Sequence, residues 1–227
     1  MKKEVVQKIV KATGVTVGEL VLVHFWGDDS DKEIANQFMA AVAAEGATPF
    51  LLQQSRSVNR DIFSVAKPEC FDERYYNMLS SFDAVLDVFA YQPIILGYEL
   101  EKEQQDLYRR YIATIFGEFM KCKRFSQIRI PTMANAEESE LEPEDFIKRM
   151  EAAYDVDYDK LQRACQSEIE KYKDAKKVVI HTGENCQLER ELGNRSWNMD
   201  AGDGDMPCGE IYIAPVEEKT NGTIFFD

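Results

Sequence analysis

Four short apolar runs constrain the fold of this 227-residue chain more than any other feature. Short apolar runs bounded by Gly, Pro or Asp indicate strands, and the first of them, ELVLVHFW, is nearly continuous, which is typical of a strand that is covered on both faces of a parallel sheet. Stretches with helical periodicity stand between the runs, for example about 32–45 and 99–122. The alternation predicts right-handed crossovers and an α/β fold, with an open, mainly parallel sheet and flanking helices. We expect strands near residues 19–25, 48–53, 83–89 and 126–130.

The pattern changes after Glu142. Two helical stretches follow in succession, and Pro143 is suited to the first turn of the first of them. After Lys176 the chain becomes rich in short apolar runs that indicate strands. We therefore expect an α/β N-terminal domain over residues 1–175 and a β-rich segment over residues 176–227.

Composition excludes several classes of function. The formal net charge of −14 disfavours binding to nucleic acid or to an anionic membrane surface, because both would repel the chain. No apolar run approaches the roughly 20 residues of a membrane span, and the first ten residues lack the apolar core of a signal peptide. The odd number of cysteines and the lack of a CxxC motif favour reduced thiols and a cytoplasmic location. These cysteines are Cys70, Cys122, Cys165, Cys186 and Cys208.

Few residues point to a binding site by their pattern alone. His24 lies inside the first apolar run, where a hydrogen-bonded structural histidine is the simplest interpretation. A zinc site of His181 with Cys186 and Cys208 is conceivable, but its spacing fits no common pattern. The acidic, Gly-rich stretch 200–205 misses the spacing of a calcium loop and reads as a solvated turn. No phosphate-loop motif occurs.

The stretch 207–227, PCGEIYIAPVEEKTNGTIFFD, carries the most specific signal. It resembles the signature of the aminopeptidase T family of metallo-aminopeptidases, the leucyl or thermophilic aminopeptidase type. In that family a Pro-x-Gly-Glu segment leads into a strand that ends in Ala-Pro, and an Asn-Gly-Thr turn starts the next strand. Matching residues are Pro207, Gly209, Glu210, Ala214, Pro215, Asn221, Gly222 and Thr223. Stretches at the start, centre and near residue 180 also resemble the family, although Gly183–Cys186 departs from its usual Gly-Thr-Asp-Leu.

The resemblance implies one site residue, since the family's matching glutamate is a metal ligand. We therefore expect Glu210 to bind a divalent ion, one of two (Zn, Co, Mn or Mg) in the complete family site. It also implies a peptide substrate, from which N-terminal residues are removed. Residue patterns agree, because Glu210 opens an apolar strand beside an acidic loop, and carboxylates suit such ions.

The other metal ligands of the family, a further carboxylate and a His/Asp set, lie beyond the signature, and we assign no catalytic residue in this chain. We therefore expect this chain to be the N-terminal portion only, with the segment 176–227 opening an incomplete metal-binding domain. Alone, it should be inactive or weakly active. Its apolar signature strands would lack covering partners, which predicts association with itself or with a complementing chain.

Two other functions stay open at this point. One is a non-catalytic α/β binding or regulatory protein derived from the same family. The other is a relative of metal-dependent ring-cleaving oxygenases, because one fold can host different metal chemistry.

Overall fold

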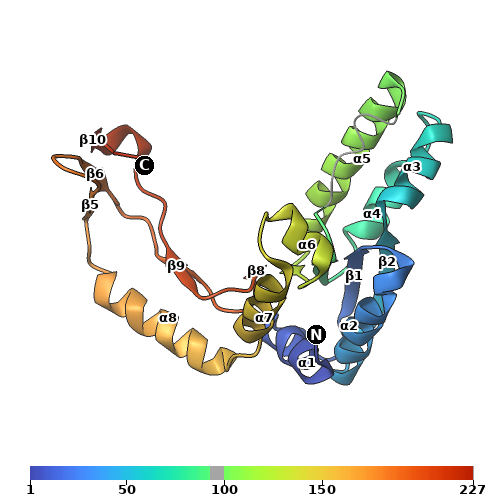
Figure 1. The fold of residues 1–227 in the computed structure, drawn as a ribbon, viewed down its shortest axis with the longest axis horizontal. Coiled ribbons are helices and arrows are strands. Elements are labelled where there is room, and N and C mark those ends of the chain that lie inside the picture. Colours follow the sequence, from blue (N-terminus) through green and yellow to red (C-terminus); the bar gives the residue numbers. More distant parts are fainter. Residues whose placement is uncertain (93–99, 227) are drawn as a thin grey trace. The chain divides into compact units, whose positions relative to one another are not determined.

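The computed structural model describes residues 1–92 and 100–226 (Figure 1). Its largest sheet is parallel and has the order β2-β1-β3-β4-β8. This confirms the predicted α/β class and the four predicted strands, with bounds that differ by one or two residues. The strands are β1 (Leu20–Trp26), β2 (Thr48–Gln54), β3 (Ala84–Phe89), β4 (Arg124–Arg129) and the short β8 (Asp205–Met206).

Helices connect the parallel strands, as the alternation predicted. The helices of the described chain are α1 (Lys3–Ala12), α2 (Lys32–Ala44), α3 (Arg56–Val65), α4 (Glu73–Leu79), α5 (Lys102–Phe119), α6 (Met133–Glu138), α7 (Pro143–Tyr154) and α8 (Tyr158–Tyr172), with short 3-10 turns η1 (Asp29–Asp31) and η2 (Glu217–Lys219). Pro143 opens α7, as expected. The short helices α3, α4 and α6 were not predicted from the sequence. The expected start of the long helix at Glu99 lies outside the described residues.

The two faces of the sheet bury alternate residues of the same strands. On β1, the side chains of Val21, Val23 and Phe25 are fully buried on one face, and α2 packs against β1 and β2. On the other face, Leu22 and Val85 join a core cluster built from α3, α4 and α5. Because both of their faces are covered, β1 and β3 appear in the sequence as nearly continuous apolar runs.

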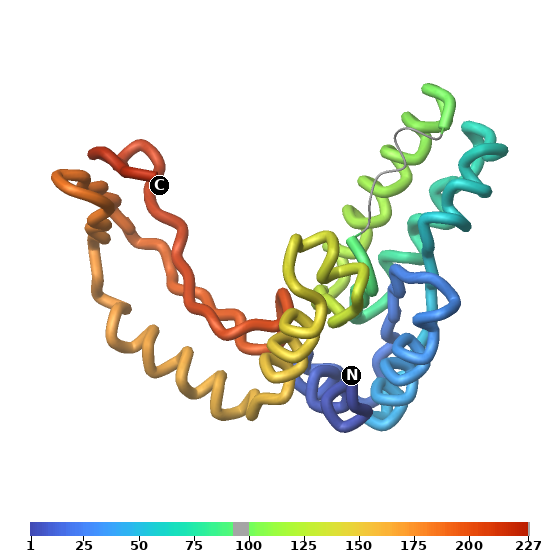
Figure 2. The backbone as a smooth tube through the Cα atoms, in the orientation of Figure 1, coloured from blue at the N-terminus to red at the C-terminus, as the bar shows by residue number. Residues whose placement is uncertain are grey.

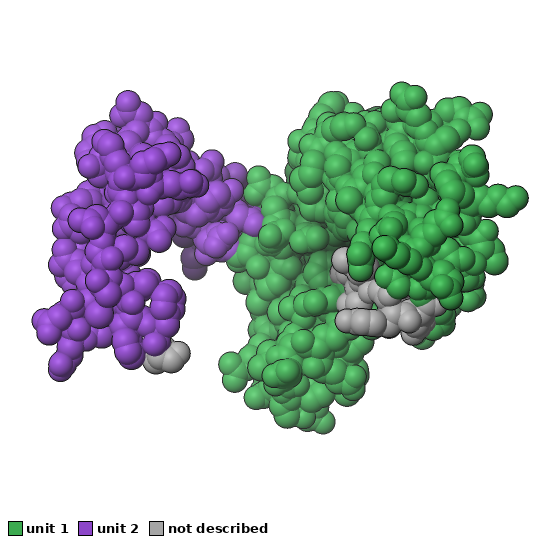
Figure 3. Space-filling view, turned by 90° about the horizontal axis from the view of Figure 1, so that it is seen from above, with its two compact units in different colours: residues 1–156, 202–208 green, residues 157–201, 209–227 purple. Residues whose placement is uncertain are grey.

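The described chain forms two compact units, coloured separately in Figure 3. Unit 1 comprises residues 1–156 and 202–208, and unit 2 comprises residues 157–201 and 209–227. The segment 202–208 belongs to unit 1 because it adds β8 beside β4. The Tyr154 hydroxyl is 2.7 Å from the Arg129 carbonyl and 2.6 Å from the Met206 carbonyl, so it links the two strands. The domain boundary near residue 175 remains a prediction.

Unit 2 contains α8 and two small antiparallel sheets, whose path can be followed as a tube in Figure 2. Strands β5 (Lys177–His181), β6 (Gln187–Glu191) and β10 (Thr220–Gly222) form one sheet, in the order β10-β6-β5. Strands β7 (Asn198–Asp200) and β9 (Glu210–Tyr212) form the other. This confirms the predicted β-rich end. Within the described residues, no helix is long and apolar enough to cross a membrane.

Gly222 explains why the Asn-Gly-Thr turn needs a glycine. Its φ is +132°, which side chains rarely allow, and a Cβ there would lie 2.0 Å from the Gln187 carbonyl oxygen. The close approach lets β10 pair with β6, with Gly222 opposite Leu188.

Candidate functional site

Glu210 stands at the first position of β9, with an exposed side chain. Gly209 before it has a φ of +138°, and a Cβ at this position would lie 3.2 Å from a methyl carbon of Leu161 on α8. Only glycine fits this backbone without strain, which gives the Gly-Glu pair of the signature a physical reason. The metal-ligand role of Glu210 itself remains a prediction.

A second carboxylate lies directly across from Glu210. The antiparallel register of β7 and β9 pairs Asp200 with Glu210, so their side chains emerge on the same face of the ribbon. Asp200 is buried. The pKa of the Cys165 thiol on α8 is raised, first by burial of the thiol and second by the nearby Asp200 charge. Like charges in opposing positions destabilise a ribbon, and a cation between them would offset that cost.

The two carboxylates of this pair fit part of the ligand set of a divalent-ion site. Carboxylate oxygens suit Mg, Mn, Co or Zn, but a closed site needs more protein ligands than two. Among residues 1–92 and 100–226, no three His, Cys, Asp or Glu side chains gather closely enough to hold an ion. The facing pair Asp200 and Glu210 therefore provides two carboxylates and no third ligand among the described residues.

The histidines lie elsewhere. His24 is fully buried, its Nδ1 lies 2.7 Å from an Asp87 carboxylate oxygen, and its Nε2 lies 2.6 Å from Gln54 Nε2. This confirms the structural interpretation of His24. Asp87 also accepts from Gln127, and Gln54 accepts from Tyr111, so the chain of hydrogen bonds crosses four strands. His181 ends β5 with an exposed side chain.

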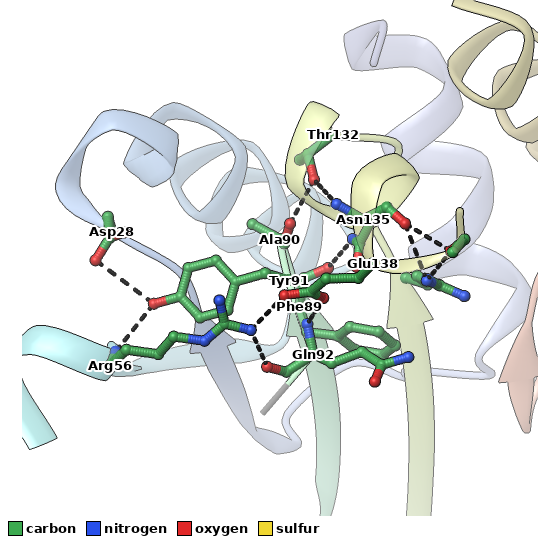
Figure 4. A network of polar contacts seen from close by, with 11 residues as sticks. Asp28, Arg56, Phe89, Ala90, Tyr91, Gln92, Thr132, Asn135 and Glu138 are labelled. Atoms are coloured by element: carbon green, nitrogen blue, oxygen red, sulfur yellow. Dashed lines mark hydrogen bonds and ion pairs between the residues drawn. The ribbon is translucent and has the colours of Figure 1, made fainter. Parts of the chain in front are cut away.

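A second polar cluster occupies the carboxyl ends of the parallel strands (Figure 4). It brings together Asp28 after β1, Arg56 after β2, Tyr91 and Gln92 after β3, and Glu138 on α6. The strand order reverses between β1 and β3, and such a point is where ligands commonly bind in open α/β sheets. This cluster was not predicted from the sequence, although polar residues that follow each apolar run were a usable signal.

The Arg56 guanidinium is the centre of this cluster. It forms an ion pair with Glu138, donates to the Gln92 carbonyl at 2.9 Å, and lies 4.2 Å from the centre of the Tyr91 ring. Glu138 also accepts the Gln92 main-chain N–H at 2.8 Å. Burial raises the pKa of Tyr91 to about 12, so its hydroxyl stays protonated and can donate to Asp28, 3.5 Å away. These contacts clamp the loops after β2, β3 and β4 together.

Thr132 and Asn135 fasten the same edge from the β4 side. The Thr132 hydroxyl donates to the Ala90 carbonyl, and Asn135 Nδ2 donates to the Ile130 carbonyl at 2.6 Å and to the Phe89 carbonyl at 3.3 Å. We therefore interpret the cluster as a structural clamp of unit 1 (Figure 4).

Comparison with protein-family models finds no match, and neither does comparison with curated protein sequences. Comparison with solved structures finds wild-type AmpT from Thermus thermophilus, with a TM-score of 0.70 and 16% sequence identity. The similarity covers 97% of this chain and 64% of the AmpT chain, so this chain spans less than two thirds of that protein's length. At this identity the similarity shows the fold alone, and that fold is aminopeptidase-like.

Proposed function

We propose that this chain is part of a metal-dependent aminopeptidase of the aminopeptidase T family, and that Glu210 is one of its metal ligands. One observation carries the proposal. A chain that shares the AmpT fold over nearly its whole length also carries the family's Pro-x-Gly-Glu signature, at Pro207–Glu210. Two independent features, overall fold and local motif, thus favour the same family.

The local geometry adds support for a cation at Glu210. Asp200 faces Glu210 across the β7–β9 ribbon, and the pair concentrates negative charge where one ligand is expected. A bound divalent ion would supply polarisation of a peptide carbonyl and activation of a water molecule. Glu210 would hold the ion, and Asp200 would either contribute a second oxygen or strengthen the local negative potential. The proposal includes the complete family site, which holds two metal ions, and a peptide substrate.

Metal binding tests the proposal directly. We expect the 227-residue chain to bind Mn²⁺ weakly, because two carboxylates and water hold such an ion loosely, and the binding can be measured by calorimetry and by the Mn²⁺ paramagnetic resonance signal. Glu210→Gln should weaken binding several-fold. Glu217→Gln is the matched control, because Glu217 is also exposed and the substitution removes the same charge. Equal Mn²⁺ affinity in wild type and Glu210→Gln would refute the ligand role.

Activity gives a second test. We expect little or no release of p-nitroaniline from aminoacyl p-nitroanilides by this chain with Zn, Co or Mn. In a longer natural product, if one exists, Glu210→Gln should abolish most turnover while circular dichroism stays unchanged. Robust, chelator-sensitive turnover by the 227-residue chain would show that the catalytic residues lie elsewhere in it. Unchanged turnover of a longer product after Glu210→Gln would contradict the proposed role of Glu210 as a metal ligand.

A further inference from the structure

Unit 1 buries a chain of polar side chains that takes no part in the proposed metal site. His24 on β1 and Asp87 on β3 are fully buried, and Gln54 on β2 is 3% exposed. Polar groups at such depth cost free energy unless they are hydrogen-bonded, and a buried charge costs more. Among the described residues, the His24 side chain bonds to Asp87 and Gln54, and Asp87 bonds also to Gln127. The donors and acceptors along this chain therefore define where its protons lie.

The contacts of Gln54 fix the protonation state of His24. Gln54 Oε1 accepts from Asn59 Nδ2 at 3.1 Å and from the Tyr111 hydroxyl at 3.2 Å, so its Nε2 faces the imidazole. An amide nitrogen only donates, and it lies 2.6 Å from His24 Nε2, which must therefore accept. The ring proton is then on Nδ1 and is donated to Asp87, 2.7 Å away. His24 is thus neutral in this arrangement.

Asp87 is a buried carboxylate whose hydrogen-bond donors are neutral. Its two oxygens accept from His24 Nδ1 and, at 3.0 Å, from Gln127 Nε2, and among the described residues it forms no ion pair with a lysine or arginine. A proton taken up at His24 Nε2 would place a cation 2.7 Å from this carboxylate, which favours uptake. The same proton would face the Gln54 amide donor, which opposes uptake. Two arrangements of the network therefore compete.

The side chains beyond Gln54 can reverse their hydrogen bonds. The Tyr111 hydroxyl lies 3.1 Å from that of Tyr75 on α4, and either oxygen can be the donor. Burial raises the pKa of both tyrosines, so both hydroxyls stay protonated and keep the two roles. If the Gln54 amide turns over, its oxygen accepts the new proton of His24, and its nitrogen donates to Tyr111. Tyr111 then donates to Tyr75, and the Asn59 amide turns over in the same way.

Helix α5 covers this network with apolar rings. The ring centres of Phe116 and Phe119 lie 6.1 and 5.0 Å from that of His24. The charged residue that α5 buries is Glu118, which is paired with Lys121. Rings exclude water, and electrostatic interactions are stronger where water is excluded. A single proton at His24 therefore has a large effect on the hydrogen bonds around it.

We propose that His24 and Gln54 form a one-proton switch inside unit 1. In one state His24 is neutral and the Gln54 amide donates to it. In the other state His24 carries a second proton, forms an ion pair with Asp87, and the hydrogen bonds to Tyr111 and Tyr75 run in the opposite direction. The proton comes from solvent, and the N–H bond at Nε2 is the covalent bond that forms and breaks. Because Tyr75 is half-buried, the reversal reaches the surface of α4.

Nuclear magnetic resonance of the ¹⁵N-labelled full chain tests the proposal. The chain has two histidines, and His181, which is exposed, is the internal control. At about pH 8, His24 should have a protonated Nδ1 and a bare Nε2, whereas His181 should exchange between both tautomers. Toward about pH 5, both ring nitrogens of His24 should become protonated, and the Gln54 side-chain amide signals should shift with them. A proton on Nε2 at the higher pH, a ring that never changes, or proton uptake without a response of Gln54 would overturn the proposal.

A substitution at Gln54 should hold the switch in one state. Gln54→Glu replaces the amide donor with an acceptor, so His24 should stay doubly protonated even at about pH 8. Gln7→Glu is the matched control, because Gln7 is exposed on α1 and the substitution adds the same charge. A neutral His24 in a folded Gln54→Glu variant would contradict the switch. If this variant does not fold, the wild-type titration still decides.

A substitution at the surface end tests the coupling along the chain. Tyr75→Phe removes the acceptor that Tyr111 needs in the protonated state, so the ratio of protonated to neutral His24 should fall by about fivefold at a given pH, the effect of one hydrogen bond. Tyr76→Phe is the matched control, at the neighbouring half-buried tyrosine. An unchanged ratio in Tyr75→Phe, or an equal change in both variants, would refute the coupling. These measurements need no metal, so their outcome is independent of the Glu210 test.

Discussion

Removing one hydroxyl should loosen the segment that leads into the signature. Tyr154 is fully buried, and its hydroxyl is shared between the carbonyls of Arg129 on β4 and Met206 on β8. Tyr154→Phe keeps the ring and deletes these contacts, and it leaves two carbonyls in need of another donor. One such hydrogen bond contributes about 1 kcal/mol net, and an unsatisfied buried group costs about 1–3 kcal/mol. We expect a loss of about 1–2 kcal/mol in the free energy of unfolding.

Urea unfolding, followed by circular dichroism, measures this loss, and hydrogen exchange locates it. The amides of residues 203–207 should exchange faster in Tyr154→Phe, because the Tyr154 hydroxyl is one of the groups that hold this segment beside β4. Tyr212→Phe, at an exposed tyrosine, is the control and should stay within about 0.5 kcal/mol of wild type. Unchanged stability together with unchanged exchange at residues 203–207 would refute the reasoning.

Three further substitutions test other parts of the structure. Gly222→Ala should destabilise unit 2 by more than about 2 kcal/mol, because the φ of Gly222 is positive and a Cβ there would lie 2.0 Å from a main-chain oxygen. Gly117→Ala is the control and should stabilise the protein by up to about 1 kcal/mol, because Gly117 lies on α5 with open space around it. The urea midpoints of the two variants measure the difference. Hydrogen bonds from Lys123 and from the main chain of β1 hold the pKa of Asp83 below its usual value. Its contribution to stability is therefore present above about pH 4 and lost below it, so wild type and Asp83→Asn should converge in urea midpoint at low pH. Arg56→Lys should lower the free energy of unfolding in urea by about 1 kcal/mol, because lysine lacks the planar guanidinium that binds both Glu138 and the Gln92 carbonyl. An unchanged urea midpoint would contradict the clamp.

The sequence by itself determined the α/β class and the positions of the four long parallel strands. The reason is local, because a strand that is buried on both faces must be apolar at nearly every position, as in residues 20–26. It also marked the Gly209–Glu210 motif, where a positive φ requires glycine. Short helices such as α4 were not predicted, because seven residues show too little periodicity to be distinguished from a turn.

Only the tertiary structure decided which distant residues meet. The pairing of Asp200 with Glu210 depends on the register of two three-residue strands, and no local pattern encodes a register. The clamp around Arg56 joins residues from four separate elements, which become neighbours because parallel strands bring their carboxyl ends to one edge. Sequence patterns report the periodicity of single elements, whereas contacts between elements arise from how the chain packs, and for that reason the site needed the fold.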